Sequence, residues 1–244
     1  MTDQGNVAEP TARTAGSEHR LTRLQKAMVK SMTTAVSTTA LSQVSRDIDM
    51  GSVAADREGA EPRYSINTYI LAAVASCLGD HPMLNGRLDG RVVTVADRVN
   101  LGIAVSVPDG LVVPVVHGAD RLSFAELDRA AAAAADKARN GTLTFDDVEE
   151  GTFTVSNLGM FGIDGGVAIP PPPQGAILLV GRVRPRFEPD ADGAPELRPV
   201  GWFGLTFDHR FIDGAAAARL LADLDATLSD APRLRVAAPG DGAS

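Results

Sequence analysis

The sequence is poor in cysteine and in aromatic side chains, since its 244 residues include one cysteine, one tryptophan and 5% aromatic residues. A single cysteine, Cys77, excludes an intrachain disulfide and a metal site built from several thiolates. Cys77 lies in the apolar segment 70–78, which is typical of a buried helix, so we expect it to fill core space rather than to act as a nucleophile. One free cysteine also fits a cytoplasmic protein.

The chain also lacks clustered histidines, an excess of positive charge and a long apolar run. The histidines, His19, His81, His117 and His209, are scattered without the spacing of metal ligands. The net charge of -8 is the opposite of the basic surface that nucleic acid requires. No apolar stretch reaches the roughly 20 residues that span a bilayer, and the polar N-terminus has no secretory signal. We therefore expect no metal, no nucleic acid and no membrane as a partner.

What the chain does contain is enough apolar material for one sizeable core. Its length and its 44% of hydrophobic residues predict a single large domain, which we place over residues 19–236. Residues 1–18 are rich in Thr, Gly, Ala and charge without periodicity, which predicts a disordered arm. Residues 237–244 are expected to form a polar tail.

Hydrophobic periodicity predicts helices and strands that do not alternate regularly. Helices are expected over residues 21–35, 65–78, 123–139 and 215–228. Strands are expected over residues 41–50, 91–95, 101–107, 111–116, 152–156, 176–183 and 200–207. Residues 51–63 indicate a loop or a short helix, and residues 190–195 a hairpin loop. This order predicts an α/β fold, a two-layer sandwich with a mixed sheet, rather than a doubly wound parallel sheet.

The most informative stretch is residues 208–214, Asp-His-Arg-Phe-Ile-Asp-Gly, between an expected strand and an expected helix. His209 and Asp213 are four positions apart, so they can form an imidazole base and its orienting carboxylate. An imidazole exchanges protons near neutral pH, which suits a general base. The pattern alone is also that of an ordinary loop histidine beside an aspartate that caps the next helix. Asp208 and Arg210, which flank His209, are interpreted as structural salt-bridge partners.

A second motif lies upstream, at residues 151–162, Gly-Thr-Phe-Thr-Val-Ser-Asn-Leu-Gly-Met-Phe-Gly. It predicts a strand that ends in a loop punctuated by glycines. Ser156, at the end of that strand, could present its hydroxyl to a reacting group or merely bond to the backbone. The motif alone leaves both interpretations open.

Together the two motifs resemble the catalytic domain of the dihydrolipoamide acyltransferases, the E2 components of 2-oxoacid dehydrogenase complexes. The similarity covers residues 21–236 and includes Gln-Lys-Ala-Met-Val-Lys at 25–30, Asn-Leu-Gly-Ile-Ala-Val at 100–105 and Pro-Asp-Gly-Leu-Val-Val-Pro at 108–114. These segments occur in the family's order and at comparable spacing. The resemblance implies a chloramphenicol-acetyltransferase-like fold and transfer of an acyl group between coenzyme A and a dihydrolipoyl thiol.

The resemblance also assigns roles to individual residues. It makes His209 the general base, Asp213 the residue that supports it and Ser156 the donor that faces the oxyanion. By position, contacts with coenzyme A, bound as acyl-CoA, fall on Ser156, Asn157, Gly181, Val183 and, by a looser match, Thr33. The resemblance further implies a homotrimer, in which His209 and Ser156 of neighbouring chains face each other across a subunit boundary.

The chain departs from the family's usual pattern in several places. It has no segment that resembles a lipoyl domain or a subunit-binding domain, so we expect the lipoyl group on a separate carrier protein, beside a separate 2-oxoacid decarboxylase. Residues 40–42 are Ala-Leu-Ser where the family has Pro-His-Phe, Ser106 replaces an aspartate and Pro171 replaces an asparagine. Two alternatives therefore stay open, a non-catalytic scaffold of such a complex and a standalone transferase that acylates a small acceptor. The sequence leaves the acyl group open.

Overall fold

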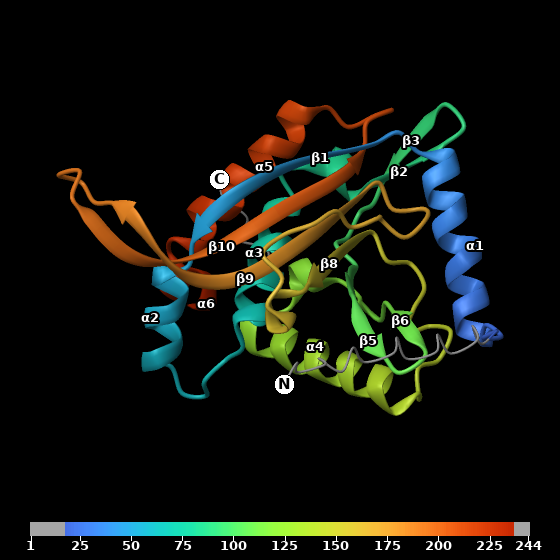
Figure 1. Cartoon of the computed structure of the whole chain (residues 1–244), viewed down its shortest axis with the longest axis horizontal. Coiled ribbons are helices and arrows are strands. Elements are labelled where there is room, and N and C mark those ends of the chain that lie inside the picture. The colour runs from blue at the N-terminus through green and yellow to red at the C-terminus, as the bar shows by residue number, and fades with distance from the viewer. Residues whose placement is uncertain (1–17, 237–244) are drawn as a thin grey trace, which may run out of the picture.

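A six-stranded sheet forms one layer of the structure, and helices cover one of its faces (Figure 1). The computed structural model describes residues 18–236, so the expected arm, except for its last residue, and the expected tail lie outside the described residues. In spatial order the strands are β1 (Leu41–Asp49), β10 (Pro195–Asp208), β9 (Ala176–Pro189), β8 (Phe153–Asn157), β4 (Leu101–Ile103) and β7 (Val115–Val116). The expected two-layer α/β sandwich is confirmed.

The sheet is mixed because β8 runs parallel to both of its neighbours, β9 and β4. The remaining pairs of neighbouring strands in the sheet are antiparallel: β1 with β10, β10 with β9 and β4 with β7. Two short ribbons flank the sheet, one of β2 (Gly86–Asp89) with β3 (Val92–Val95) and one of β5 (Val105–Val107) with β6 (Gly110–Val112). Beyond the sheet, β9 and β10 continue as a hairpin that projects from one end of the molecule (Figure 1).

Side chains that cap the backbone start four of the α-helices. The helices are α1 (Arg23–Thr38), α2 (Gly51–Gly59), α3 (Ile66–Leu78), α4 (Phe124–Asn140), α5 (Gly214–Leu228) and α6 (Ala231–Val236), with short 3₁₀ turns at Pro82–Asn85, Ala119–Arg121 and Gly159–Phe161. Thr22 before α1 and Ser123 before α4 form capping boxes. Ser65 and Asp213 accept a backbone N–H at the start of α3 and α5. The helix starts expected from periodicity lie within two residues of these capped starts.

The core lies between the sheet and α3. Apart from its first two residues and Ser76, α3 is buried throughout, and Phe153, Phe203 and Phe207 meet it from the sheet. Cys77 belongs to this core, where burial raises the pKa of its thiol to about 11. The thiol therefore stays protonated at neutral pH, and the expected core role of Cys77 is confirmed.

The strands expected over residues 101–107 and 111–116 are each broken in two, so this part of the prediction was wrong. Residues 101–103 and 115–116 stay in the main sheet, whereas residues 105–107 and 110–112 leave it as the β5–β6 ribbon. Pro114 separates β6 from β7 and has no N–H to donate to a ladder, so one strand cannot pass through it unbroken. Periodicity does not reveal this break, because apolar residues continue on both sides of it.

The strands expected over residues 176–183 and 200–207 are longer than predicted. β9 runs to Pro189 and β10 starts at Pro195, so residues 190–194 alone form the turn. Proline normally argues against a strand, but here it lies where neither strand has a second neighbour. The segment 51–63, expected to be a loop or a short helix, contains α2. Helix α6 was not predicted, because its six residues are too few to show hydrophobic periodicity.

Asp56 of α2 joins three helices through one carboxylate. It accepts a hydrogen bond from Tyr69 Oη of α3 at 2.6 Å and one from Arg235 Nε of α6 at 2.9 Å. Burial alone would raise the pKa of Asp56, but the bonds from Tyr69 and Arg235 outweigh burial and lower that pKa. Tyr69 is fully buried, so its hydroxyl depends on this partner.

We predict that Asp56→Ala lowers the free energy of unfolding at pH 7 by about 2–4 kcal/mol, because it leaves the Tyr69 hydroxyl and Arg235 unpaired. Asp136→Ala, which removes an exposed pair with Arg139, is the matched control and should cost little. Since the pKa of Asp56 is lowered, its contribution is present above the ordinary carboxyl pKa and is lost as the pH falls through the lowered value. Urea unfolding over that pH range measures both effects, and equal losses in the two variants would contradict the prediction.

Candidate active site

His209 stands on a loop that its neighbours fix in place. Asp208, the last residue of β10, is 2% exposed, and its carboxylate accepts hydrogen bonds from the Arg210 guanidinium at 2.6 Å and from Ala40 N–H at 3.2 Å. His209 N–H donates to Ala40 O at 2.8 Å, which joins the loop to the residue before β1. Burial would raise the pKa of Asp208, but the bonds from Arg210 outweigh it and lower that pKa. The expected salt bridge between Asp208 and Arg210 is confirmed.

The imidazole of His209 is exposed. It lies beside the ring of Phe207, with the two ring centroids 5.5 Å apart. It forms no hydrogen bond with any other side chain or backbone group of residues 18–236. A rigid backbone therefore carries a side chain whose nitrogens are open to a proton from outside the chain.

Asp213 is engaged with α5 rather than with His209. Its carboxylate accepts the N–H of Ala216 at 2.6 Å and so caps α5. No hydrogen bond joins Asp213 to His209 in the described part of the chain. Ile212, which is 1% exposed, anchors the same loop in the core. Any support that Asp213 gives to His209 therefore passes through the loop that both residues share.

Ser156 and Asn157 form the end of β8, where that strand pairs with β9. Ser156 is half-buried, and its hydroxyl has no hydrogen-bond partner among residues 18–236. The side chain of Asn157 is engaged, because its oxygen accepts Gly159 N–H at 2.9 Å and its nitrogen donates to Asn67 at 3.4 Å. Ser156 thus offers a hydrogen-bond donor, while Asn157 shapes the turn that follows.

Gly181 lies beside the end of β8, because it follows the β9 residue that pairs with Asn157. A Cβ at Gly181 would come within 2.1 Å of the Asp164 carbonyl oxygen. Glycine is therefore needed there for close packing against the loop that precedes β9. Among the residues matched to coenzyme A contacts, the structure brings together Ser156, Asn157 and Gly181.

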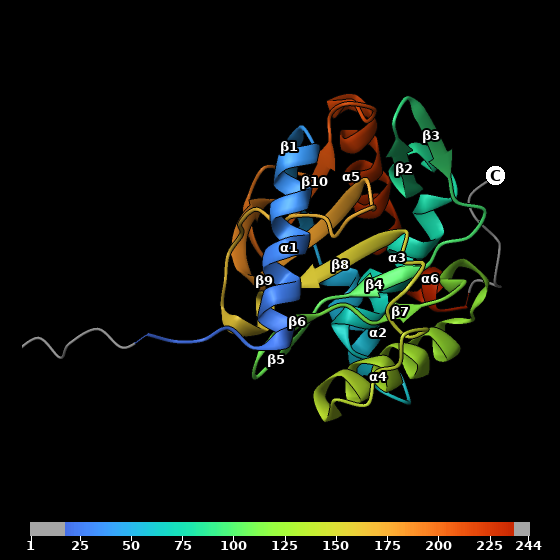
Figure 2. The same ribbon diagram turned by 90° about the vertical axis from the view of Figure 1, so that its right-hand side faces the viewer.

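The other two residues matched to coenzyme A are Val183, two residues beyond Gly181 on β9, and Thr33, which belongs to α1. Val183 is half-buried and packs against the core. Thr33 is exposed on α1, a helix that stands outside the layer of α3, α5 and α6 (Figure 2). The contacts of all five residues with coenzyme A stay predictions.

Within one chain, Ser156 and His209 lie far apart. Asp208 N–H bonds to Gly175 O, which places His209 near the start of β9, whereas Ser156 pairs with Leu179 farther along that strand. The two residues are four residues apart along the strand direction, at about 3.3 Å each, and two strands apart across the sheet, at about 4.8 Å each. Together these give a backbone separation of roughly 16 Å. A base and an oxyanion donor that serve one thioester must both reach the same reacting group. One chain alone does not assemble both halves of the expected site.

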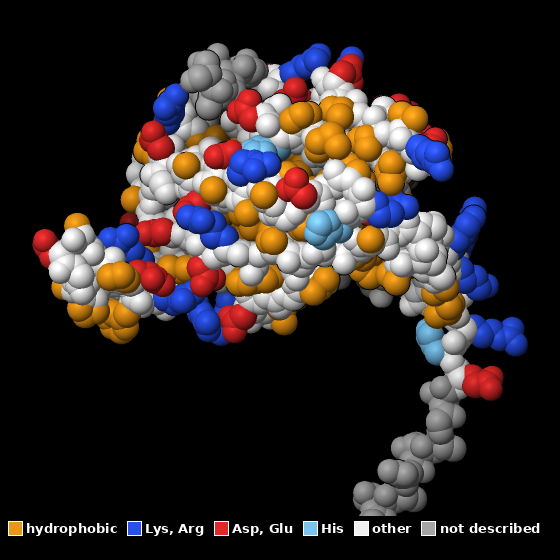
Figure 3. All heavy atoms as spheres, turned by 90° about the horizontal axis from the view of Figure 1, so that it is seen from above, with side chains coloured by type: hydrophobic (Ala, Val, Ile, Leu, Met, Phe, Trp, Pro, Cys, Tyr) orange, Lys and Arg blue, Asp and Glu red, His pale blue; other side chains and the backbone are white. Residues whose placement is uncertain are grey.

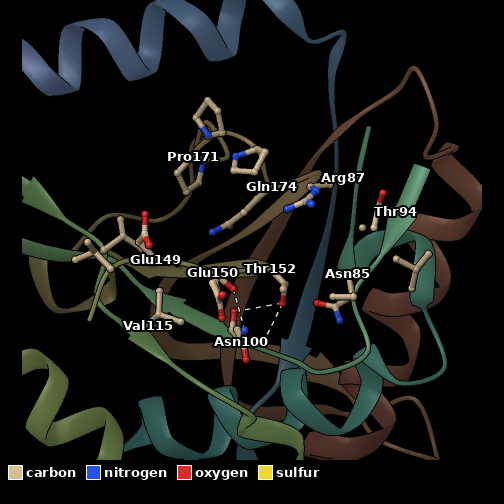
Figure 4. Close-up of a pocket in the computed structure, with 18 of the residues that line it drawn as sticks. Asn85, Arg87, Thr94, Asn100, Val115, Glu149, Glu150, Thr152, Pro171 and Gln174 are labelled. Carbon is tan, nitrogen blue, oxygen red and sulfur yellow. Dashed lines mark hydrogen bonds between the residues drawn. The ribbon is translucent and has the colours of Figure 1, made fainter. Parts of the chain in front are cut away.

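A separate cavity of about 700 Å³ opens near the other end of β8 (Figure 4). It lies between the β2–β3 ribbon, the turn before β8 and the proline turn 171–173, and its polar side chains include Arg87, Asn100, Glu150 and Gln174. Asn100 Nδ2 donates to Glu150 O at 2.9 Å and holds that turn. His209 and Ser156 do not line this cavity, but its lining residue Gln174 precedes Gly175, whose carbonyl accepts the Asp208 N–H.

The described residues offer no ready metal centre. Within residues 18–236, no group of three or more histidine, cysteine, aspartate or glutamate side chains could hold a metal ion. In the same range, no helix is long and apolar enough to cross a membrane. The chemistry at hand is that of the His209 imidazole and the Ser156 hydroxyl.

Sequence reasoning missed the contacts that position these side chains. The main chain of Ala40 bonds to both Asp208 and His209, and the Thr154 hydroxyl donates to Gln174 at 2.6 Å. The ring of Trp202 packs so closely on the loop after β8 that a Cβ at residue 165 would come within 2.8 Å of it. These four contacts join segments far apart in the sequence, so no local spacing could signal them.

Comparison with known proteins identifies relatives over nearly the whole chain. Residues 14–236 match the family described as 2-oxoacid dehydrogenases acyltransferase (catalytic domain). The dihydrolipoyllysine-residue succinyltransferase component of the Haemophilus influenzae 2-oxoglutarate dehydrogenase complex is 34% identical over 240 residues, which cover 94% of this chain and 58% of that protein. Its mitochondrial human counterpart is 33% identical over 242 residues, which cover 93% and 53%. The chain thus spans little more than half the length of these relatives.

Solved structures give the same result for the fold. The dihydrolipoamide acetyltransferase of Azotobacter vinelandii has a TM-score of 0.85 at 28% identity, covering 93% of this chain and 99% of that one. The description of that structure names one serine, one histidine and one asparagine whose role in the catalytic mechanism was investigated. A truncated catalytic core from Thermoplasma acidophilum has a TM-score of 0.81 at 31% identity, covering 88% and 99%. Chloramphenicol acetyltransferase, at 18% identity and a TM-score of 0.54, shares the fold alone and confirms that expectation.

We predict that Gly181→Ala destabilises the protein by about 2 kcal/mol, because the new Cβ would overlap the backbone of Asp164. Gly214→Ala is the matched control, since nothing lies within 4 Å of a Cβ at that position and alanine favours the first turn of α5. The control should be neutral or slightly stabilising. Thermal unfolding of both variants and the wild type measures the difference, and equal midpoints would show that Gly181 is not required for packing.

Proposed function

We propose that this chain, which belongs to the family of 2-oxoacid dehydrogenase acyltransferase catalytic domains, transfers an acyl group between coenzyme A and a dihydrolipoyl thiol. The observation that carries the proposal is that one chain presents both an exposed His209 on a fixed loop and a Ser156 hydroxyl without a hydrogen-bond partner among residues 18–236. The relatives named above are dihydrolipoyllysine-residue succinyltransferases, which supports the same class of donor and acceptor. We propose that the acceptor is a dihydrolipoyl group, which a 2-oxoacid decarboxylase loads with the acyl group.

Each of the two side chains has one task in the transfer. His209 takes the proton of the attacking thiol, because the thiolate is the nucleophile. The thiolate adds to the thioester carbonyl carbon, and the Ser156 hydroxyl donates a hydrogen bond to the oxyanion that forms. The carbon–sulfur bond to the leaving thiolate then breaks, and that thiolate takes the proton back from His209. Such an oxyanion donor typically contributes about 10²–10³ in rate.

The spacing of the residues supports these roles. The histidine and the asparagine named for the Azotobacter vinelandii enzyme are four positions apart, as His209 and Asp213 are here. The named serine precedes that histidine by about fifty positions, as Ser156 precedes His209. Asparagine can cap a helix as aspartate does, so we assign Asp213 the fixing of the loop rather than a proton transfer.

We also propose that the working unit is a homotrimer whose sites are each shared by two chains. The separation of roughly 16 Å between Ser156 and His209 in one chain supports a site that a second chain completes. A head-to-tail contact that repeats around a threefold axis closes a ring and forms three such sites. The exposed imidazole of His209 supports this arrangement, because it is accessible to a neighbouring chain.

A comparison of donors and acceptors tests the proposed reaction. Succinyl-CoA and acetyl-CoA are the first donors, after the names of the relatives, and dihydrolipoamide is compared with small amines and alcohols as acceptor. Transfer to small acceptors alone would favour a standalone transferase, and no transfer at all would leave a scaffold. We propose a cytoplasmic location, which the free and buried Cys77 supports, although the human relative is described as mitochondrial.

We predict that His209→Ala lowers kcat by about 10²–10⁴-fold, because the attacking thiol loses its base. The thermal midpoint and the binding of acyl-CoA should not change. Asp213→Asn should lower kcat less than tenfold, because the amide oxygen still caps α5. Release of coenzyme A thiol measures both rates, and full activity in a folded His209→Ala protein would refute its role as base.

Mixing two inactive variants tests whether a site is shared. We predict that His209→Ala and Ser156→Ala chains, refolded together, recover activity that neither shows alone, since random trimers contain about one quarter of sites with both residues intact. Each variant refolded by itself is the control. If verified mixed trimers stay inactive, the site lies within a single chain.

A further inference from the structure

The projecting hairpin, residues 184–200 of β9 and β10, has one apolar and one charged face. Side chains alternate between the faces of a strand, and the register pairs Phe187 with Leu197 and Arg186 with Arg198. The apolar face therefore consists of Pro185, Phe187, Pro189, Pro195, Leu197 and Pro199. The opposite face carries Arg184, Arg186, Glu188, Glu196 and Arg198.

The charged face of the projecting hairpin is satisfied by its own chain. Arg186 pairs with Asp47 at 2.5 Å, and Arg198 pairs with Glu196 at 2.5 Å and with Asp49 at 3.3 Å. Asp47 and Asp49 belong to β1, so these pairs fix the hairpin to the neighbouring strand. No further partner is needed on this side.

The apolar face is, in contrast, uncovered. It continues the face of the sheet that packs on the core, because Val183 packs against the core and Pro185 and Phe187 follow at alternate positions of the same strand. Phe187 is 74% exposed and Leu197 is 58% exposed. Figure 3 shows hydrophobic side chains on this projecting end of the molecule. In a two-layer α/β fold, a helix normally covers such a face.

Two features of the projecting hairpin disfavour pairing with an identical hairpin. Its prolines have no N–H to donate, so the strand edges are poor templates for another strand. Asp190 and Asp192 at the tip have no cationic partner among residues 18–236, and two such tips would repel each other. The surface is suited to a helix that combines apolar residues with positive charge.

Helix α1 of the same sequence has this composition. It contains Arg23, Lys26 and Lys30 and no acidic residue, although the whole chain carries a net charge of -8. Val29 and Val36, seven positions apart and so on one face, are 54% and 58% exposed. Ala35 is the only buried residue of α1, and this helix lies at the end of the molecule opposite the projecting hairpin (Figure 1).

We propose that the apolar face of the projecting hairpin binds α1 of a second copy of this chain. The contact is head-to-tail, because the two surfaces lie at opposite ends of one chain, and such a contact closes a ring in the homotrimer proposed above, on which this inference rests. The hairpin face alone is smaller than the roughly 800 Å² that each partner of a stable interface buries. It therefore strengthens a larger interface rather than forming one by itself.

The double variant Phe187→Ser with Leu197→Ser tests the proposal. Both side chains are exposed in the single chain, so the fold should persist, and the dissociation constant of the trimer should rise at least tenfold. Phe145→Ser, a change at a 70% exposed phenylalanine elsewhere, is the matched control and should leave assembly unchanged. Sedimentation equilibrium measures both. A trimer as tight in the double variant as in the wild type overturns the docking alone, whereas a monomeric wild type also overturns the homotrimer.

Chemical cross-linking gives a second, independent readout. Val29→Cys and Leu197→Cys in one chain place a thiol on α1 and one on the projecting hairpin, while the natural Cys77 is buried. With a short bis-maleimide, the double variant should give covalent dimers and trimers, and each single variant should stay monomeric on a denaturing gel. Cross-linking of the double variant no greater than that of the single variants, in a protein that sediments as a trimer, overturns the proposal.

Discussion

The arrangement of this molecule depends on the buried carboxylate of Asp208. A buried charge is tolerated where it is paired and hydrogen-bonded, and Asp208 receives the Arg210 guanidinium and the Ala40 N–H. These bonds hold the end of β10 against the residue that precedes β1. The His209 N–H then bonds to Ala40 O, so the backbone of the proposed base is fixed although its imidazole is exposed. A group that exchanges protons with a substrate needs this combination of a fixed position and an open side chain.

The strand directions place Ser156 and His209 at different ends of the sheet within one chain. β8 runs parallel to β9, and β9 runs antiparallel to β10, so the C-terminal ends of β8 and β10 lie at opposite levels of the sheet. Ser156 is at the first of these ends and His209 follows the second. No rotamer of either side chain spans that difference. If both act on one thioester, the second residue must come from another copy, and assembly becomes a condition for chemistry.

Local sequence signals predicted the parts of the fold that short-range interactions control. Periodicity predicted the starts of α1, α3, α4 and α5 to within two residues, and Thr22, Ser65, Ser123 and Asp213 cap these starts through bonds that span three residues. The break at Pro114 and the length of the hairpin beyond Pro185 could not be read, because both depend on which strands lie alongside. Proline is tolerated in a strand that has one neighbouring strand, but it argues against a strand that has a neighbour on both sides.

The candidate site shows the same division between local and long-range information. The two motifs indicate Ser156 and His209. For Asp213 they allow either an orienting carboxylate or a helix cap, and the structure shows the cap, with the Ala216 N–H as donor. Gly181 was matched to a ligand contact, and the structure adds a packing requirement set by Asp164. A position in a motif states which residue type is present, but the partner of that residue depends on segments that the chain brings together from elsewhere.

Helix α1 links the proposed contact between chains to the loop that carries His209. It ends at Thr38, and two residues later the main chain of Ala40 bonds to both Asp208 and His209. In the described chain α1 is held mainly by its contacts with β6, where Met28 lies against Gly110. A neighbour that packs on the outer face of α1 would restrict this helix from the other side as well. The backbone of His209 would then be fixed by the same contact that brings Ser156 of a second chain towards it.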